Sequence, residues 1–493
     1  MDSQHSGETL HRSLEARHLT MIAIGGAIGT GLFVASGASV AQAGPGGATL
    51  AYLVIGMMVF FLMTGLGEMA AYMPESGSFT LYSERFVDPA FGFAQGWNYW
   101  FNWAVTIAVE LTAAQIVMAF WFPDVPGIWW SALFLGLFVL LNVISVRGFG
   151  EGEYWFAMIK VIAVVVFLIT GTGMVFGAWG DNPHPGFGNL TVGDAPFVGG
   201  LGAIIGVAMI AGFSFQGTEL VGVTAGEAQN PEKTIPHAIK QIFWRILIFY
   251  VLSIFLIGVL LPYNDPRLLQ TGVKDIAVSP FTLVLEETGV KAAASLMNAV
   301  ILTAILSAGN SGMYASTRTL YSMAQMGQAP KIFGRVSKGG VPVAALLLTT
   351  AVGALCFVSS LFGDQTVYLW LVNLSGLCGF IAWLGIAISH YRFRKGFVAQ
   401  GRSLSELPYH ASFFPFGPLF AFALCLVVML GQNYEAFFAR DIPWASVAAT
   451  YIGIPVFLAI WLGYRWRHKT RFVRLDEMQF PSRNVQEGDS RTS

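Results

Sequence analysis

Apolar stretches of about twenty residues recur from one end of the chain to the other, and they restrict the possible fold more than any other feature. Backbone polar groups in lipid must be satisfied within the segment itself, so stretches of this length are expected to be helices. Membrane β-strands would be about half as long and would alternate in polarity. The sequence therefore predicts an all-α polytopic membrane protein with twelve transmembrane helices, placed at 19–43, 47–73, 95–121, 128–146, 155–178, 198–225, 241–262, 291–323, 341–361, 365–390, 414–432 and 444–464.

The composition agrees with a lipid environment. Of all residues, 55% are hydrophobic and 11% are charged, and the mean hydropathy is +0.62, whereas a soluble chain is about 25% charged. The net charge of −1 gives no reason to expect a nucleic-acid partner. The three cysteines lie in apolar stretches, the histidines lack ligand spacing, and no Walker A motif occurs. We therefore expect no metal, no cofactor and no enzymatic activity.

Basic residues predict the orientation, because cytoplasmic loops carry an excess of lysine and arginine. With the N-terminus inside, only Arg267, Lys274, Lys291 and Arg440 lie outside and Lys160 lies within a span. The cytoplasmic clusters include 233–245 and 392–402. We predict a membrane protein with cytoplasmic tails at 1–18 and 465–493 around a membrane domain at 19–464.

Two of the predicted helices are interrupted. Span 1 carries Gly25, Gly26, Gly29 and Gly31, and span 6 has a glycine at 212 and another at 217, with the polar residues Ser214 and Gln216 between them. Each is the first of five spans, which predicts a five-plus-five inverted repeat: about 19–178, then about 198–390, with two further helices at 414–464. Unwound turns expose amides and carbonyls that would bind the carboxylate and ammonium of an amino acid. The alternative is small-residue helix packing, a pattern that Gly25 and Gly29 satisfy.

Ionisable residues inside spans are costly and are candidates for function. They are Glu68, Glu110, Lys160, Glu219 and Glu227. Of Glu219 and Glu227, we expect Glu219 to be the functional one, because it follows the span 6 break whereas Glu227 is nearer water.

Two helical faces could line a site. In span 3, Tyr99, Trp103, Thr106 and Glu110 share one side of the helix, which would suit a cation path by cation–π contact and ion pairing. The alternative is interfacial aromatics and core packing. In span 8, a polar stripe includes Asn310 and Ser311, which indicates either a site lining or interhelical hydrogen bonds.

Several motifs resemble the amino acid transporter family of the amino acid–polyamine–organocation superfamily. They are RHLTMIAIGG at 17–26 with GLF at 31–33, QAGPGG at 42–47, GEMA at 67–70 and GFSFQGTE at 212–219. Residues 91–108, 262–281 and 431–437 are similar to the bacterial lysine-specific permeases of that family. The resemblance covers the chain apart from its tails, and it implies a location in the bacterial inner membrane.

The resemblance implies alternating access around a central site. It implies that amides of Gly29, Thr30 and Gly31 hold the substrate carboxylate, and that carbonyls around Ser214 and Gly217 take the α-ammonium. Phe213 stands where relatives carry an aromatic gate. Lys160 stands where some carry a span 5 lysine instead of sodium, whose ammonium would bridge spans 1 and 8 and exchange a proton. Lysine permeases often have aspartate where Glu110 stands, which puts the fit of the cationic side chain in question.

The function we expect is secondary active import of L-lysine by proton symport. Lys160 and Glu219 are the candidate proton-coupling residues, and Glu110 or Glu219 would accept the ε-ammonium. A cationic amino acid exchanger on the same fold and a lysine-binding membrane sensor are the alternatives. A sensor would offer the periplasmic loop 262–290 to a membrane regulatory partner.

Overall fold

Every regular element of the computed structural model is a helix within the residues that it describes, which are 28–75, 78–144, 149–178, 186–223, 230–268, 278–290, 292–337 and 340–481. Each of the twelve predicted spans contains a helix. Spans 1 to 5 contain, in order, α2 (Thr30–Phe33) with the first part of α3 (Ala35–Tyr72), the remainder of α3, α5 (Pro89–Ala119), α6 (Gly127–Ile144) and α7 (Phe149–Val175). Spans 6 to 10 contain α8 (Gly200–Phe215) with α9 (Leu220–Val223); α10 (Pro231–Arg245) with the π-helix η3 (Ile246–Val251) and α11 (Leu252–Leu260); α13 (Ala293–Gln325); α14 (Val343–Gly353) with η5 (Ala354–Val358) and α15 (Ser359–Phe362); and α16 (Asp364–Ala399). Spans 11 and 12 contain α17 (Phe416–Gly431), and α18 (Trp444–Tyr451) with α19 (Gly453–His468). Among the described helices, eight are long and apolar enough to cross a membrane individually.

Short helices connect some of the spans. The two α-helices of this kind are α4 (Ser78–Phe86), before span 3, and α12 (Pro280–Glu286), within the loop that follows span 7. The 3-10 turns are η1 (Gly188–Thr191), η4 (Lys331–Gly334), η6 (Leu404–Glu406) and η7 (Tyr434–Phe438).

Local chemistry explains the bend in one long helix and the start of another. Gly44 has φ of +71° and Pro45 follows it, so the continuous element α3 changes direction between spans 1 and 2. A Cβ at Gly44 would lie 2.8 Å from the carbonyl oxygen of Pro196, which leaves only glycine at this bend. Helix α5 begins with Asp88 as N-cap, whose Oδ1 accepts from the Ala90 amide at 2.9 Å, and with proline at the first helical position.

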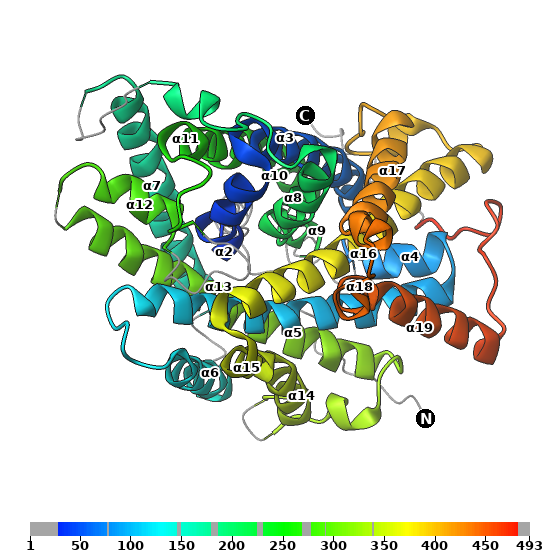
Figure 1. Ribbon diagram of the computed structural model, residues 1–493. Coiled ribbons are helices and arrows are strands. Elements are labelled where there is room, and N and C mark those ends of the chain that lie inside the picture. The colour runs from blue at the N-terminus through cyan, green and yellow to red at the C-terminus, as the bar shows by residue number, and fades with distance from the viewer. Residues whose placement is uncertain are drawn as a thin grey trace, which may run out of the picture.

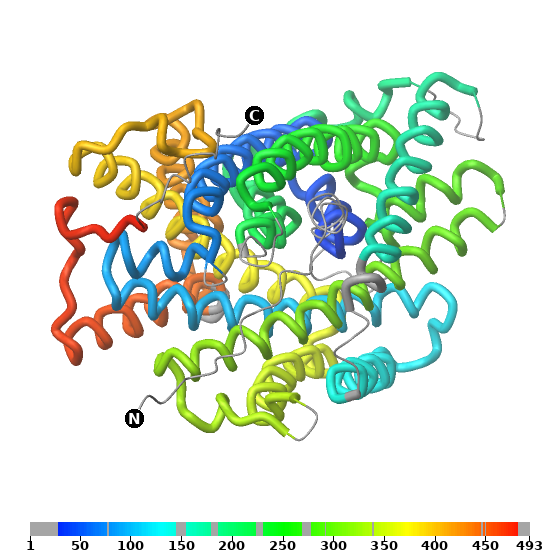
Figure 2. The backbone as a smooth tube through the Cα atoms, turned by 180° about the vertical axis from the view of Figure 1, so that it is seen from behind, coloured from blue at the N-terminus to red at the C-terminus, as the bar shows by residue number. Residues whose placement is uncertain are grey.

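Corresponding members of the two groups of five spans pack on each other. Helix α2 of span 1 contacts α8 of span 6, α3 contacts α10 and α11, and α5 contacts α13. Figures 1 and 2 show α2 and α8 between α3 on one side and the long helix α5 on the other. Helices α6 and α14 cover the opposite side of α5. This arrangement places both predicted breaks at the centre of the molecule.

Helix α16 continues beyond the predicted end of span 10, so basic residues assigned to a cytoplasmic loop lie on a helix. One of them, Arg394, is buried, and its Nε donates to Oε1 of Glu68 at 2.6 Å while its Nη2 contacts Oε2. The Ala411 amide also donates to Glu68 Oε2, at 2.6 Å. Because the carboxylate is fully paired by its partners, Glu68 has a structural role that ties α3 to α16.

The segment 470–481, which we call the C-terminal segment, packs on the ends of several helices instead of extending away. Thr470 donates to Oδ1 of Asp88 at 2.7 Å, and the Val473 amide donates to the Val87 carbonyl at 2.9 Å. Gln400, after the end of α16, donates to the carbonyls of residues 475 and 478 at 2.9 and 2.8 Å. Tyr72, at the end of α3, donates to the carbonyl of residue 481 at 3.0 Å.

Candidate functional site

The break in span 6 lies where the glycine and polar residues predicted it. Helix α8 ends at Phe215, Gln216 has ψ of 151°, and α9 begins at Leu220. Gly217 has φ of +87°, a conformation that residues with a side chain rarely adopt. Its amide donates to Oε1 of Glu219 at 3.3 Å, so the unwound turn holds a carboxylate.

In the described part of span 1, extended backbone precedes the helix. Gly29 has φ of −148° and ψ of −153°, and the helix starts only at Thr30. Gly25 and Gly26 lie outside the described residues. A Cβ at Gly31 would lie 2.5 Å from the Cα of Ser214, so the two interrupted helices touch each other at these residues. Their contact fits the prediction of one shared site.

One face of α5 reaches both breaks. At one end, the Tyr99 hydroxyl donates to Oε1 of Glu219 at 3.4 Å. At the other, Glu110 Oε1 accepts from the Thr30 hydroxyl at 3.1 Å. The eleven positions between Tyr99 and Glu110 correspond to about 16 Å along the helix. Trp103 lies between them, its ring in an edge-to-face contact with that of Tyr99 at 6.2 Å.

The carboxyl of Glu219 is buried among polar partners from three spans. Besides Gly217 and Tyr99, Trp383 Nε1 on α16 donates to Oε2 at 3.4 Å. Arg245 at the end of α10 interacts electrostatically with Glu219. Its Nη2 donates to the hydroxyl of the neighbouring Thr218 at 2.9 Å, and its side chain is 2% exposed.

Sequence reasoning missed Arg245 as a site residue. The sequence places Arg245 at the end of the basic cluster 233–245, whereas the structure shows its guanidinium buried against the span 6 break. The usable signal was its position within predicted span 7, which begins at 241. A charge inside a span boundary is costly wherever it lies, so it should have been weighed with the other intramembrane charges.

Lys160 lies on α7 on the other side of the site. Its side chain is 1% exposed, and its ammonium interacts electrostatically with Glu110. The carbonyl of Thr30 accepts from the Tyr368 hydroxyl at 3.2 Å, a contact from α16 that the sequence did not suggest. The span 1 break is therefore surrounded by a carboxylate, an ammonium and a phenol.

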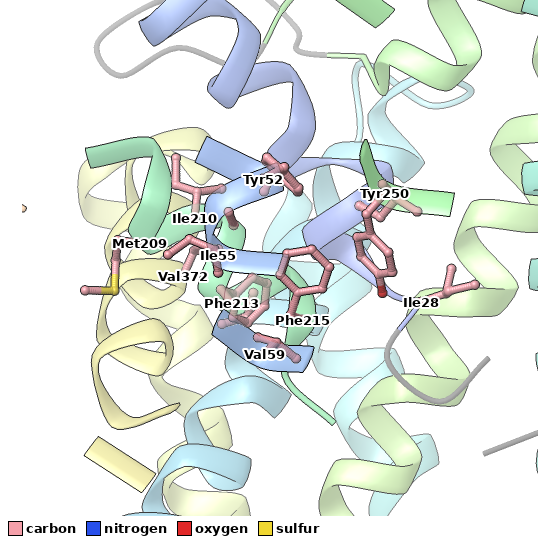
Figure 3. Packing of buried hydrophobic residues seen from close by; sticks show 14 of the residues in the cluster. Ile28, Tyr52, Ile55, Val59, Met209, Ile210, Phe213, Phe215, Tyr250 and Val372 are labelled. Carbon is pink, nitrogen blue, oxygen red and sulfur yellow. The ribbon is translucent and has the colours of Figure 1, made fainter. Parts of the chain in front are cut away.

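The remaining predicted residues of span 6 face a dry environment. Phe213 is buried in the apolar cluster that also contains Val59 and Phe215, as Figure 3 shows. The Ser214 hydroxyl is within hydrogen-bond distance of the Tyr52 hydroxyl at 2.9 Å, and it donates to the Ile210 carbonyl. Tyr52 thus connects the contact between the two breaks to α3.

The polar stripe of span 8 divides between two environments. Asn310 accepts from Nδ2 of Asn142 on α6 at 3.0 Å, which favours the predicted alternative of interhelical hydrogen bonding for this residue. Ser311 is half-buried. Gly309 of α13 packs against Phe138 and Glu110, and a Cβ there would lie 3.4 Å from that of Glu110.

Taken together, two buried carboxylates and two buried cations surround the touching breaks. Such a constellation can hold a small solute that carries both charges, and the aromatic side chains of α5 can contact a cation between them. Within the described part of the chain, no group of three or more histidine, cysteine, aspartate or glutamate side chains is arranged to hold a metal ion.

The sequence profile of the family described as "Amino acid permease" matches residues 18–477, nearly the whole chain. The chain belongs to the amino acid permease family.

Two relatives of this permease are lysine-specific permeases named LysP. The one from Escherichia coli (strain K12) is 64% identical over 472 residues, 96% of each chain. The one from Lactococcus lactis subsp. cremoris is 53% identical over 95% of this chain and 92% of the relative. The histidine permease HisP of the same L. lactis strain is 50% identical over 95% of this chain and 97% of its own.

A solved structure supports the fold of the permease. The manganese transporter of Eremococcus coleocola superposes with a TM-score of 0.53, covering 95% of this chain and 96% of that one at 14% sequence identity. At that identity the likeness concerns the architecture and not the transported solute.

Proposed function

We propose that this permease imports L-lysine by proton symport through alternating access. The observation that carries the proposal is the face of α5, which brings the Glu110 carboxylate to the span 1 residue Thr30 and the Tyr99 hydroxyl to the Glu219 carboxylate at the span 6 break. The names of the LysP relatives support lysine. A histidine permease is nearly as similar as the second of them, so overall identity alone does not choose the substrate.

The charges of lysine match the proposed site. Its α-carboxylate would accept hydrogen bonds from the amides at Gly29–Gly31, and its α-ammonium would donate to the carbonyls freed around Ser214 and Gly217. The ε-ammonium needs an acceptor away from water, and a buried carboxylate is the strongest one available. Glu110 and Glu219 are the acceptors that we propose, with Tyr99 and Trp103 lining the path between them.

Proton coupling would use the charge balance at the breaks. Lys160 interacts electrostatically with Glu110, so the loss of a proton from its ammonium would change the charge at the span 1 break. Glu219 would gain and lose a proton at the span 6 break, where Arg245 supplies a cation that keeps its charge. The arrival of a substrate cation would then alter which protonation states are favourable.

Closure would depend on residues beside the break in α8. Phe213 packs in the apolar cluster of Figure 3, and the proposed gating motion moves its ring against the substrate. We also propose that the permease lies in the bacterial inner membrane with both termini in the cytoplasm, as the distribution of basic residues supports.

The decisive experiment is lysine uptake into liposomes that contain only the purified protein. Uptake is compared under an inward proton gradient, an inward sodium gradient and no gradient, with protein-free liposomes as control. Accumulation above equilibrium with protons alone supports symport. Flux only into liposomes preloaded with amino acid would make the protein an exchanger and would remove the coupling role from Lys160.

Lysine binding without any flux would instead favour a sensor that meets a regulatory partner at loop 262–290. In the described part of this loop, Arg267 pairs with Asp265 at 2.8 Å and approaches Glu286 at 3.7 Å. Although burial would raise it, the hydrogen bonds from Arg267 hold the pKa of Asp265 below its usual value. A partner at this surface would therefore meet acidic residues that already have a basic neighbour.

A further inference from the structure

A cavity of about 460 Å³ lies away from the substrate site, where three chain segments end on one side of the molecule. It is bounded by the start of α5, by residues 327–330 after α13, and by the end of α19. Figure 1 shows α19 beside α5 at this edge. The distribution of basic residues assigns all three ends to the cytoplasmic side. The cavity is thus at the level of the inner lipid headgroups.

One wall of the cavity is a column of stacked rings from two helices. The rings of Phe93 on α5 and Tyr464 on α19 stack at 4.1 Å, and Tyr464 stacks on His468 at 4.1 Å. On the other side, Trp97 Nε1 donates to the carbonyl of Gln328 at 3.2 Å, which fixes the loop to α5. Flat, immobilised rings lose little conformational freedom when a ligand packs on them.

The polarity of the cavity changes along α19. Ile460 lies about 12 Å further into the membrane than His468, since eight helical positions separate them. At the cytoplasmic rim stand Arg467 and His468, both exposed. All ten lining residues are described and none is acidic. The Glu84 carboxylate contacts one lining residue, since it accepts from Gln328 Nε2 at 3.2 Å.

We propose that this cavity binds one anionic phospholipid. Its phosphate would lie against Arg467 and His468, and its acyl chain would follow the apolar side past Tyr464 and Ile460. Basic pockets between helices on the cytoplasmic side suit such headgroups, and the volume is in the range of small-ligand sites. The apolar depth distinguishes a lipid from free phosphate, which would leave the inner half of the cavity unfilled.

A bound lipid would connect α19 to α5, the helix whose other face joins the two breaks. The inference stands apart from the proposed function, because lipid binding can be measured without transport.

The test is native mass spectrometry of the purified full-length protein with phosphatidylglycerol or phosphatidylcholine. The chain offers a matched pair of variants, each losing one exposed cation. Arg467→Gln alters the cavity rim, whereas Arg474→Gln removes a guanidinium that pairs with Asp476 in the C-terminal segment. We expect the wild type to retain phosphatidylglycerol in preference to phosphatidylcholine. Arg467→Gln should weaken its retention about fivefold, the size expected for one cation at an anionic surface, and Arg474→Gln should not.

Equal retention by the two variants would overturn the proposal, as would equal retention of the two lipids by the wild type. Displacement of the lipid by millimolar inorganic phosphate would assign the rim to a free anion. A second variant, Tyr464→Leu, keeps every charge and removes the stacked wall; unchanged phosphatidylglycerol retention in this variant would also contradict the proposed position of the lipid.

Discussion

The contact between the two breaks gives a sharp steric prediction at Gly31. The change Gly31→Ala places a methyl carbon 2.5 Å from the Cα of Ser214, 2.8 Å from its Oγ and 3.0 Å from its Cβ. Non-bonded carbon atoms prefer about 3.5–4.0 Å, so α2 and α8 must move apart by roughly 1 Å. The nearest atom belongs to the backbone, and no side-chain rotation can relieve the clash.

The magnitude follows from the cost of overpacking. Extra methylenes in a well-packed interior cost about 1–3 kcal/mol. Alanine is the better helix former, so helix propensity opposes this loss and cannot explain it. If the strain falls on the geometry of the substrate site, lysine binding should weaken by about 5- to 150-fold.

The assay is isothermal titration of lysine into purified protein, together with a thermal unfolding curve. The control is Gly206→Ala on α8, the helix that carries Ser214, because the contact of the new methyl there is the Gln432 carbonyl oxygen at 3.8 Å. Gly206→Ala should bind lysine normally. Wild-type lysine affinity and wild-type unfolding temperature in Gly31→Ala would refute the close packing of the two breaks.

Four further outcomes are expected. Lys160→Ala should abolish proton-driven accumulation in liposomes while lysine binding persists; intact accumulation would remove Lys160 from coupling. Glu110→Gln should weaken lysine binding measured by titration far more than it lowers the unfolding temperature, because the amide can still accept from Thr30 but carries no charge. Arg394→Gln should cost about 3–5 kcal/mol of stability by leaving Glu68 buried without its cation, and adding Glu68→Gln should restore part of it in thermal unfolding. Asp265→Asn should lower the free energy of unfolding by less than about 1 kcal/mol, since the pair with Arg267 is partly exposed. The pKa of Asp265 is lowered in the folded protein, so this loss of stability should be measurable by thermal unfolding above the unfolded pKa of about 3.9. It should vanish as the pH falls below the folded pKa.

The spans and the span 6 break could be read from the sequence because both depend on local properties. Twenty apolar residues are enough to predict a membrane helix, and a glycine beside polar residues at mid-span is enough to predict its interruption. The stepping of Tyr99 and Glu110 along one helical face also placed them correctly on a shared side of α5.

What the sequence could not supply is the identity of the neighbouring helix. Asn310 and Gly309 are adjacent on α13, yet Asn310 hydrogen-bonds to Asn142 on α6, whereas Gly309 packs between Phe138 on α6 and Glu110 on α5. The burial of Arg245 and the extension of α16 past the expected membrane boundary depend likewise on tertiary partners, Thr218 in one case and Glu68 in the other.

The C-terminal segment joins the C-terminal ends of two helices that belong to different repeats. Tyr72 closes α3 in the first repeat and Gln400 follows α16 in the second, and both hydrogen-bond to this same short stretch of backbone. A movement that separates these two ends must therefore release the segment from at least one of them. Otherwise the ends of α3 and α16 move together, and any separation of helices on this side of the molecule has to come from helices that the segment does not contact.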